Sequence, residues 1–292
     1  MHARSAVVDV YGDHLREHGW WGPVAGVVAL AQSCGVQPAA TRTAVSRLVR
    51  EGWLVAEARD GARGYAATPL AQNRLARAYR RIYASGPAPW PGSWHVVVVD
   101  HGANRRRRDH VAASLGYLGY GRLAASTWIS PRPSPELALV LAEHGATWSG
   151  VVGPLDGHSR GRIDDAANHT VGTLESTGKL TGDSTRAARL AAKVWDLDAL
   201  GTAYQSFADG LPHPADVRDL PPKAAYPVRA HLVHEWRKFL FADPGLPAEV
   251  LPRSWPGQHA RERFLDIAAG LRPAAEQFLT QTLWAVDRDA VD

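Results

Sequence analysis

The stretch SCGVQPAATRTAVSRLVREGWLVAEARDGARGYAA, residues 33–67, organises the rest of the chain. Pro38 suits the first turn of a helix, and Gly52 is typical of a helix end. Between them, apolar residues such as Val45 and Leu48 recur at helical spacing. The pattern therefore predicts a helix between Pro38 and Gly52, then a strand over residues 53–58, a turn over 59–64 and a return strand over 65–67.

The polar side of this predicted helix carries most of its arginines. Thr43, Ser46, Arg47 and Arg50 lie opposite the apolar stripe, and Arg42 lies on its flank. Forked guanidinium donors and small hydroxyls can reach base edges and phosphates, while the apolar side holds the helix to its own domain. We therefore predict that this helix contacts DNA.

The two strands and the turn behind the helix complete a recognisable order. Helix, strand, turn and strand in succession predict a winged helix-turn-helix. Arg59 and Arg63 lie at the base of the turn, from which they could reach a phosphate or the minor groove. A solvated hairpin is the alternative when each arginine is taken alone. The predicted DNA-binding residues are Arg42, Thr43, Ser46, Arg47, Arg50, Arg59 and Arg63.

The opening stretch lies inside a first domain with helices on both sides. Two helices are predicted before it, over residues 4–18 and 23–35. After it, the Thr-Pro pair at 68–69 favours the start of a basic helix, which we interpret as a connector. The proline-rich GPAPWPG, residues 86–92, is the clearest boundary. The first domain is therefore predicted to cover residues 1–86.

A second domain is predicted over residues 93–185. Its first part alternates strands and helices, which is typical of a small ferredoxin-like α+β fold. The remainder, residues 153–185, is polar, and we expect a loop or a partly ordered insertion in which residues 170–174 could form one strand. The predicted elements are a strand over 94–100, a helix ending at 118, a strand over 123–130, a helix over 133–144 and a strand over 146–152.

Four consecutive arginines begin the first helix of this second domain. They are Arg105, Arg106, Arg107 and Arg108, and their charge suits contact with a nucleic acid. Cations are not favoured at the N-terminus of a helix, so a solvated helix start is the alternative. The sequence leaves both interpretations open.

A third domain, residues 186–292, is predicted to be helical. A helix over 226–241 places Trp236 inward, and a last helix or pair of helices covers 259–286, with a kink expected at Pro273. The fold class is therefore α+β and multidomain. It combines an N-terminal winged helix-turn-helix, a ferredoxin-like middle domain and an α-helical C-terminal domain.

Composition limits the classes of protein to which the chain can belong. Its 292 residues are 45% hydrophobic and carry a formal net charge of +4, so we expect two or three ordinary cores and a mildly basic surface. The single cysteine, Cys34, excludes an internal disulfide and a cysteine metal cluster. No signal-peptide pattern and no apolar run of membrane-spanning length is found. A cytoplasmic protein is expected.

Three stretches of the sequence carry a resemblance to a known family. TRTAVSRLVREGWL at 41–54, STWISP at 126–131 and HLVHEWRKFLFADPGLPAEVLPRSWPG at 231–257 resemble the phenylacetic-acid degradation repressors, the PaaX-like transcriptional regulators. The resemblance implies a bacterial repressor of a catabolic operon. It also implies a homodimer that binds palindromic double-stranded operator DNA, and release by an acyl-CoA effector such as phenylacetyl-CoA.

An effector of the CoA thioester type needs cations for its phosphates and an apolar slot for its acyl group. The C-terminal segment, which the resemblance associates with dimerisation and effector response, offers both chemistries. Ordinary helix surface and core tryptophans are the alternative for each residue. The predicted effector-binding residues are Arg229, Trp236, Arg237, Lys238, Arg253 and Trp255.

Other chemistries are weaker matches. His231 and His234 have a spacing of three on a helix, which is not the spacing of zinc peptidases. Asp100 ends a strand of the middle domain and could hold a metal in a nuclease, although acidic residues at strand ends are commonly turn formers. We therefore predict no enzyme, no cofactor and no metal site. An activator, or a regulator answering another aromatic acid or CoA thioester, is the closer alternative, and a metal-dependent nuclease the more distant one.

Overall fold

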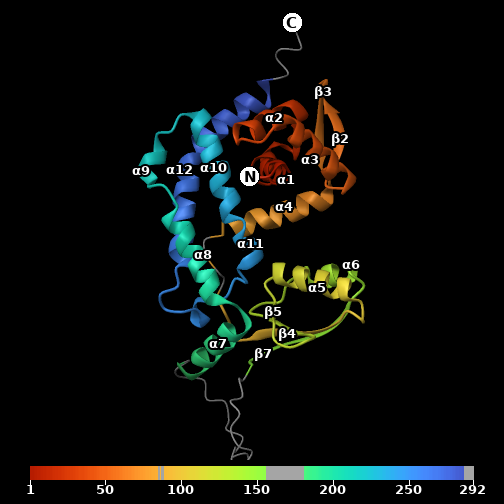
Figure 1. Cartoon of the computed structure of the whole chain (residues 1–292), viewed down its shortest axis with the longest axis vertical. Coiled ribbons are helices and arrows are strands. Elements are labelled where there is room, and N and C mark those ends of the chain that lie inside the picture. The colour runs from red at the N-terminus through yellow and green to blue at the C-terminus, as the bar shows by residue number, and fades with distance from the viewer. Residues whose placement is uncertain (85, 87–88, 156–180, 286–292) are drawn as a thin grey trace, which may run out of the picture. The chain divides into compact units, whose positions relative to one another are not determined.

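The computed structural model describes residues 1–84, 86, 89–155 and 181–285, with the side chains of 181–184 excepted. The chain divides into two compact units. Figure 1 colours the chain from the N-terminus to the C-terminus, so the segments of each unit can be followed by residue number. Unit 1 consists of Met1–Ser85, Tyr204–Leu240 and Pro256–Asp292, and unit 2 of Gly86–Ala203 and Phe241–Trp255. Segments from the predicted third domain, 186–292, therefore contribute to both units. The predicted strand at 170–174 lies outside the described residues.

Unit 1 begins with the helices that carry the opening stretch. The predicted helix over 4–18 is present in three parts and ends at Gly19, whose φ of 65° is the left-handed conformation that glycine adopts easily. The elements are α1 Ala3–Asp9, a π-helical turn Val10–His14, a 3-10 turn Leu15–His18, β1 Trp21–Pro23, α2 Val24–Ser33 and α3 Pro38–Arg50.

The two strands that follow α3 join β1 in a three-stranded antiparallel sheet, in the order β1-β3-β2. β2 covers Leu54–Arg59 and β3 covers Ala62–Ala67. The predicted turn over 59–64 was too long, because Arg59 already pairs with Ala62 across the ladder. Only Asp60 and Gly61 turn the chain, with φ of 49° and 83°. Positive φ at both residues is the requirement of a tight two-residue hairpin turn, which Asp-Gly satisfies.

The core of unit 1 joins the N-terminal helices to helices from the other end of the chain. Buried residues of α1, α2 and α3 pack with Tyr226 of α10 and with Ala275, Leu279 and Leu283 of α12. Figure 1 shows α10 and α12 running side by side. The predicted helix over 226–241 is divided after Trp236. The other helices of unit 1 are α4 Pro69–Ile82, α9 Pro214–Arg218, α10 Pro222–Trp236 and α12 Gly257–Leu283, whereas the residues of α8 Leu197–Asp209 and α11 Phe239–Ala242 are divided between the two units.

Unit 2 is built on a four-stranded antiparallel sheet in the order β5-β6-β4-β7. Unit 2 has a buried cluster on each face of this sheet, because successive side chains of β4 point to opposite faces. Val97 and Val99 face α5 and α6, whereas Trp94 and Val96 face α7 and the 3-10 turn Ala248–Val250. The predicted order of strands and helices is confirmed, with β5 added. The elements are β4 Trp94–Asp100, α5 Arg105–Tyr117, β5 Gly121–Arg122, β6 Thr127–Ser130, α6 Leu137–Glu143, β7 Thr147–Gly153 and α7 Thr181–Val194.

In the described part of the chain, no helix is both long enough and apolar enough to span a bilayer.

Candidate nucleic-acid interface

Helix α3 has one face fixed in the core of unit 1. Ala44, Val45 and Leu48 are buried there, and Thr41 is fully buried with its hydroxyl donating to the Gln37 carbonyl at 3.3 Å. Pro38 stands in the first turn of the helix, as its fixed φ favours. The predicted apolar stripe is therefore confirmed as the packing face, which holds the opposite face in a defined orientation.

The opposite face of α3 is exposed. It carries all five residues of the helix predicted to contact DNA: Arg42, Thr43, Ser46, Arg47 and Arg50. The hydroxyls of Thr43 and Ser46 donate to carbonyls one turn earlier, at 2.9 and 3.1 Å. Each hydroxyl oxygen keeps lone pairs that can accept from a partner outside the helix.

The arginines of this face are not neutralised from within the chain. Among the described residues, no hydrogen bond or ion pair involves the guanidinium of Arg42, Arg47, Arg50 or Arg63. Arg63 is exposed on β3, beside the hairpin turn. Such uncompensated cations on one side of a small module are the electrostatic footprint of a polyanion partner.

Arg59, the other predicted contact of the hairpin, has partners within unit 1. Its Nε donates to Glu57 Oε1 at 2.6 Å, and its guanidinium lies 5.3 Å from the centre of the Trp21 ring. The side chain is still 38% exposed. Arg59 therefore stiffens the hairpin against β1, and Arg63 is the better placed of the two to reach outward.

Helix α1 braces the other end of α3. Arg4 donates to Glu51 Oε2 at 2.7 Å and lies over the Trp53 ring at 5.4 Å. Thr68 also donates to the Gly52 carbonyl at 2.7 Å, closing the turn between α3 and β2. These contacts tie the position of α3 to that of α1.

On its other side, α1 and the turn after it are held by a buried ion cluster, which we define as Asp9, Asp13, His14, Tyr83, Arg229, His234, Arg237 and Glu276. At its centre Arg229 of α10 pairs with Asp13, and the two side chains are only 5% and 6% exposed. Tyr83 donates to Asp13 at 2.5 Å and accepts from Arg229 at 2.9 Å. The remaining lone pairs and protons of the pair are thus largely satisfied.

The rest of the cluster extends to both long C-terminal helices. Arg237 at the end of α10 reaches Asp9 Oδ1 at 2.8 Å, and His234 reaches Asp9 Oδ2 at 3.1 Å. His14 lies 3.0 Å from Glu276 of α12. The segment that braces α3 is therefore bound to α10 and α12 through charged groups.

The pKa values of the two buried aspartates, Asp9 and Asp13, are shifted in opposite directions. Burial alone would raise the pKa of Asp13, but the charges of His14 and Arg229 and the hydrogen bonds from Arg229 and Tyr83 outweigh it and lower that pKa. At Asp9 burial prevails over His234 and Arg237, and the pKa is raised. Asp13 is therefore the carboxylate that this cluster stabilises in its charged form.

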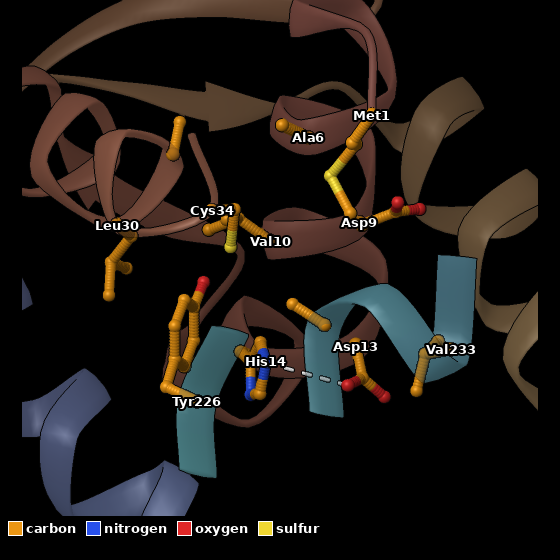
Figure 2. Close-up of a pocket in the computed structure, with 12 residues that line it drawn as sticks. Met1, Ala6, Asp9, Val10, Asp13, His14, Leu30, Cys34, Tyr226 and Val233 are labelled. Carbon is orange, nitrogen blue, oxygen red and sulfur yellow. Dashed lines mark ion pairs between the residues drawn. The ribbon is translucent and has the colours of Figure 1, made fainter. Parts of the chain in front are cut away.

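A small pocket lies against the cluster, and Figure 2 shows its walls with the ion pair between His14 and Asp13 dashed. Met1, Cys34 and Tyr226 contribute apolar wall. It has room for about one water molecule. Burial raises the pKa of the Cys34 thiol to about 11. The pocket is too small for an aromatic acyl group, and its thiol stays protonated at neutral pH.

The six predicted effector-binding residues are divided between the two units, and those of unit 1 already have partners within that unit. Arg229 is consumed by the buried ion cluster, and Trp236 is buried between aromatic rings, stacked on Phe264 at 4.7 Å. Lys238 is exposed and paired with Glu235. Arg253 and Trp255 belong to unit 2, whereas the other four belong to unit 1. The polar groups of Arg229 and Trp236 are bonded within unit 1, Arg229 to Asp13 and Tyr83 and the Trp236 indole to the Ile82 carbonyl.

The sequence signals for metal chemistry have local explanations. Asp100 is exposed and accepts from the Gly102 amide at 2.8 Å, which is the turn-forming role of a strand-end aspartate. His231 bonds the Pro227 carbonyl, and His234 belongs to the ion cluster. Within the described ranges, no group of three or more His, Cys, Asp or Glu residues is arranged to hold a metal ion.

Sequence reasoning missed the acidic and tyrosine members of the ion cluster. Asp9 and Asp13 are four residues apart, on the same helical side as the buried Ala6 and Val10. Carboxylates on an apolar helix face are the one local signal that could have indicated buried partners. Their partners lie more than 200 residues away, at Arg229 and His234.

Comparison with known proteins agrees with this architecture. Three family models match in order: PaaX-like protein at residues 2–68, PaaX protein central Cas2-like domain at 87–153, and PaaX-like protein C-terminal domain at 195–281. The transcriptional repressor PaaX of Escherichia coli (strain K12) is 28% identical over 288 residues, which are 95% of this chain and 83% of that protein. The class is thus that of transcriptional repressors rather than enzymes.

A solved structure has the same fold. The uncharacterized protein Rv0674 from Mycobacterium tuberculosis matches with a TM-score of 0.55 and 22% sequence identity, covering 95% of this chain and 98% of that one. The three family matches together extend over most of the chain. The chain belongs to the PaaX-like family. Its α+β architecture includes a Cas2-like central domain and a helical C-terminal segment.

Proposed function

We propose that this protein is a transcriptional repressor that binds operator DNA through the exposed face of α3. The observation that carries the proposal is the two-sided character of that helix. Its apolar side is buried in unit 1, while its other side presents Arg42, Arg47 and Arg50 without a neutralising partner in the described chain. Arginine forks of this kind read guanine in the major groove and bind phosphates.

The surrounding elements support a winged helix-turn-helix. The chain order is α1, β1, α2, α3, β2, β3. The strands form one sheet in the order β1-β3-β2, and β2 contacts α3 while β3 contacts α2. In this arrangement α3 enters the major groove as the recognition helix. The hairpin then acts as the wing, with Arg63 directed to a phosphate or the minor groove.

The oligomeric state and the effector are further parts of the proposal. A palindromic operator matches a homodimer, whose two α3 helices would enter major grooves about one helical turn apart. The resemblance to the phenylacetic-acid degradation repressors makes an acyl-CoA such as phenylacetyl-CoA the effector to test first. The buried ion cluster supplies a physical link between α10, α12 and the segment bracing α3.

The test is the affinity of the full chain for duplexes from its own upstream region. Arg47→Ala and Arg50→Ala should each weaken specific binding by about 1–3 kcal/mol if the side chains read bases. Fluorescence anisotropy against a specific and a scrambled duplex separates base reading from general charge. Arg218→Ala, which removes an exposed arginine from α9, is the matched control. Unchanged affinity in both α3 variants would refute the assignment of α3.

A further inference from the structure

The four arginines that begin α5 form an exposed cationic surface on unit 2, which we call the arginine surface. All of Arg105, Arg106, Arg107 and Arg108 are exposed, whereas the first buried residue of the helix is Val111. Four successive residues at 3.6 per turn go once around a helix. The guanidinium groups therefore surround the first turn of α5, and none of residues 105–110 is buried.

Among the described residues of unit 2, little neutralises this surface. Asp109 Oδ2 lies 4.0 Å from Arg105 Nε, and both side chains are well exposed. Arg107 Nη1 makes one long bond, 3.5 Å, to the Gly145 carbonyl. Asp100, at the end of β4, directs Oδ1 to the Gly102 amide. Residues 105–109 thus hold four positive charges and one negative charge, a net charge of +3.

The position of the charges makes a purely structural role a poor explanation. Cations at the N-terminus of a helix oppose the helix dipole, and adjacent like charges repel. Asn104 caps the helix, its Oδ1 accepting from the Arg107 amide at 3.0 Å, so the cap does not need the guanidinium groups. An anion from outside the chain would compensate both unfavourable terms.

We propose that the arginine surface binds the phosphate backbone of double-stranded DNA, as a contact additional to that of α3. This inference rests on the proposed function. Sites for small molecules are concave, but these four side chains are exposed around one turn of a helix, which suits an extended polyanion. Guanidinium groups pair with phosphate oxygens in a bidentate geometry. Contacts to phosphates add affinity without reading sequence.

The experiment uses the full chain with all four arginines changed to glutamine, which keeps length and helix propensity. The control is Arg186→Gln, Arg189→Gln, Lys193→Gln and Arg218→Gln combined, which removes the same charge from exposed positions elsewhere. Anisotropy of a 30-base-pair random duplex, titrated at several salt concentrations, gives the dissociation constant and its salt dependence. Circular dichroism verifies that both variants are folded.

We expect the arginine-surface variant to bind more weakly and to lose about 0.9 of the slope of log K against log salt for each phosphate contact removed. The loss should be equal for operator and random duplexes. A slope and affinity equal to those of the control variant would overturn the inference. So would calorimetric binding of inorganic pyrophosphate that depends on the four arginines while the DNA slope is unchanged.

The two proposals fail in different ways. If Arg47→Ala loses operator binding and the arginine-surface variant behaves as the control does, only the second contact is refuted. If the unaltered protein does not bind DNA at all, the proposed function itself is refuted.

Discussion

At the scale of single residues, the pair between Asp13 and Arg229 is the most consequential contact. Asp13→Asn would leave a buried guanidinium without a compensating charge, and breaking a buried pair in this way costs about 3–5 kcal/mol. Urea unfolding of the full chain measures the loss. Glu235→Gln is the control, because its pair with Lys238 is more than half exposed and such pairs contribute roughly 0–1 kcal/mol. Equal losses in the two variants would contradict the buried role.

The same substitution has a defined pH dependence. The pKa of Asp13 is lower in the folded protein than its ordinary value, so the stability it contributes is present above about pH 4 and is lost as pH falls through the lowered pKa. The stability difference between the unaltered protein and Asp13→Asn should therefore narrow on acidification. Asp9 has a raised pKa, so the sign is reversed and its contribution is lost as pH rises. On acidification the unaltered protein should therefore gain stability relative to Asp9→Asn, which is the opposite of the change expected for Asp13→Asn.

At the scale of elements, what could be predicted depended on how local its cause was. The orientation of α3 follows from a 3.6-residue pattern within thirteen residues, so the sequence indicated which side faces outward. The hairpin was located, but its turn was assigned six residues instead of Asp60 and Gly61. Arginine lies on both sides of that pair, at 59 and 63, and a second glycine follows at 64, so composition alone did not show where the strands stop pairing.

The ion cluster could not be predicted because no local pattern encodes it. Arg229 was assigned to an effector, since an arginine on a C-terminal helix is equally suited to a phosphate and to a buried carboxylate. Its pairing with Asp13 spans 216 positions of the chain. Only the packing of α10 against the segment after α1 removes water from both groups.

The contact between α2 and α12 gives an element-scale prediction. A Cβ added at Gly26 of α2 would lie 2.4 Å from the Leu283 carbonyl oxygen, a backbone atom that cannot rotate away. Gly26→Ala should therefore destabilise the protein by about 1–3 kcal/mol, as overpacking does. Gly270→Ala, at an open and exposed position within α12, should instead stabilise it by about 0.5–1 kcal/mol. Thermal unfolding compares the two variants, and a stabilising Gly26→Ala would exclude this close approach.

At the scale of the whole molecule, the structure changes the meaning of the boundary at residue 86. The proline-rich segment separates two contact units, but the first unit also needs helices from the far end of the chain. Tyr226, Leu279 and Leu283 share one buried cluster with α1, α2 and α3. The N-terminal helices and their hairpin are therefore not an autonomous module. Any ligand that alters α10 or α12 acts directly on the core that supports α3.

A fragment of residues 1–85 tests this dependence. Without α10 and α12 the fragment loses four residues of its buried cluster, Tyr226, Ala275, Leu279 and Leu283, and Asp13 loses the charge of Arg229. We expect the fragment to show no cooperative thermal unfolding and to bind a specific duplex at least about tenfold more weakly than the full chain, a change equivalent to about 1.4 kcal/mol. Adding residues 204–292 in trans should restore cooperative unfolding, because these residues contain the missing helices. A fragment that melts cooperatively by itself and binds as the full chain does would show that the N-terminal module folds alone, and that the C-terminal helices regulate it from outside its core.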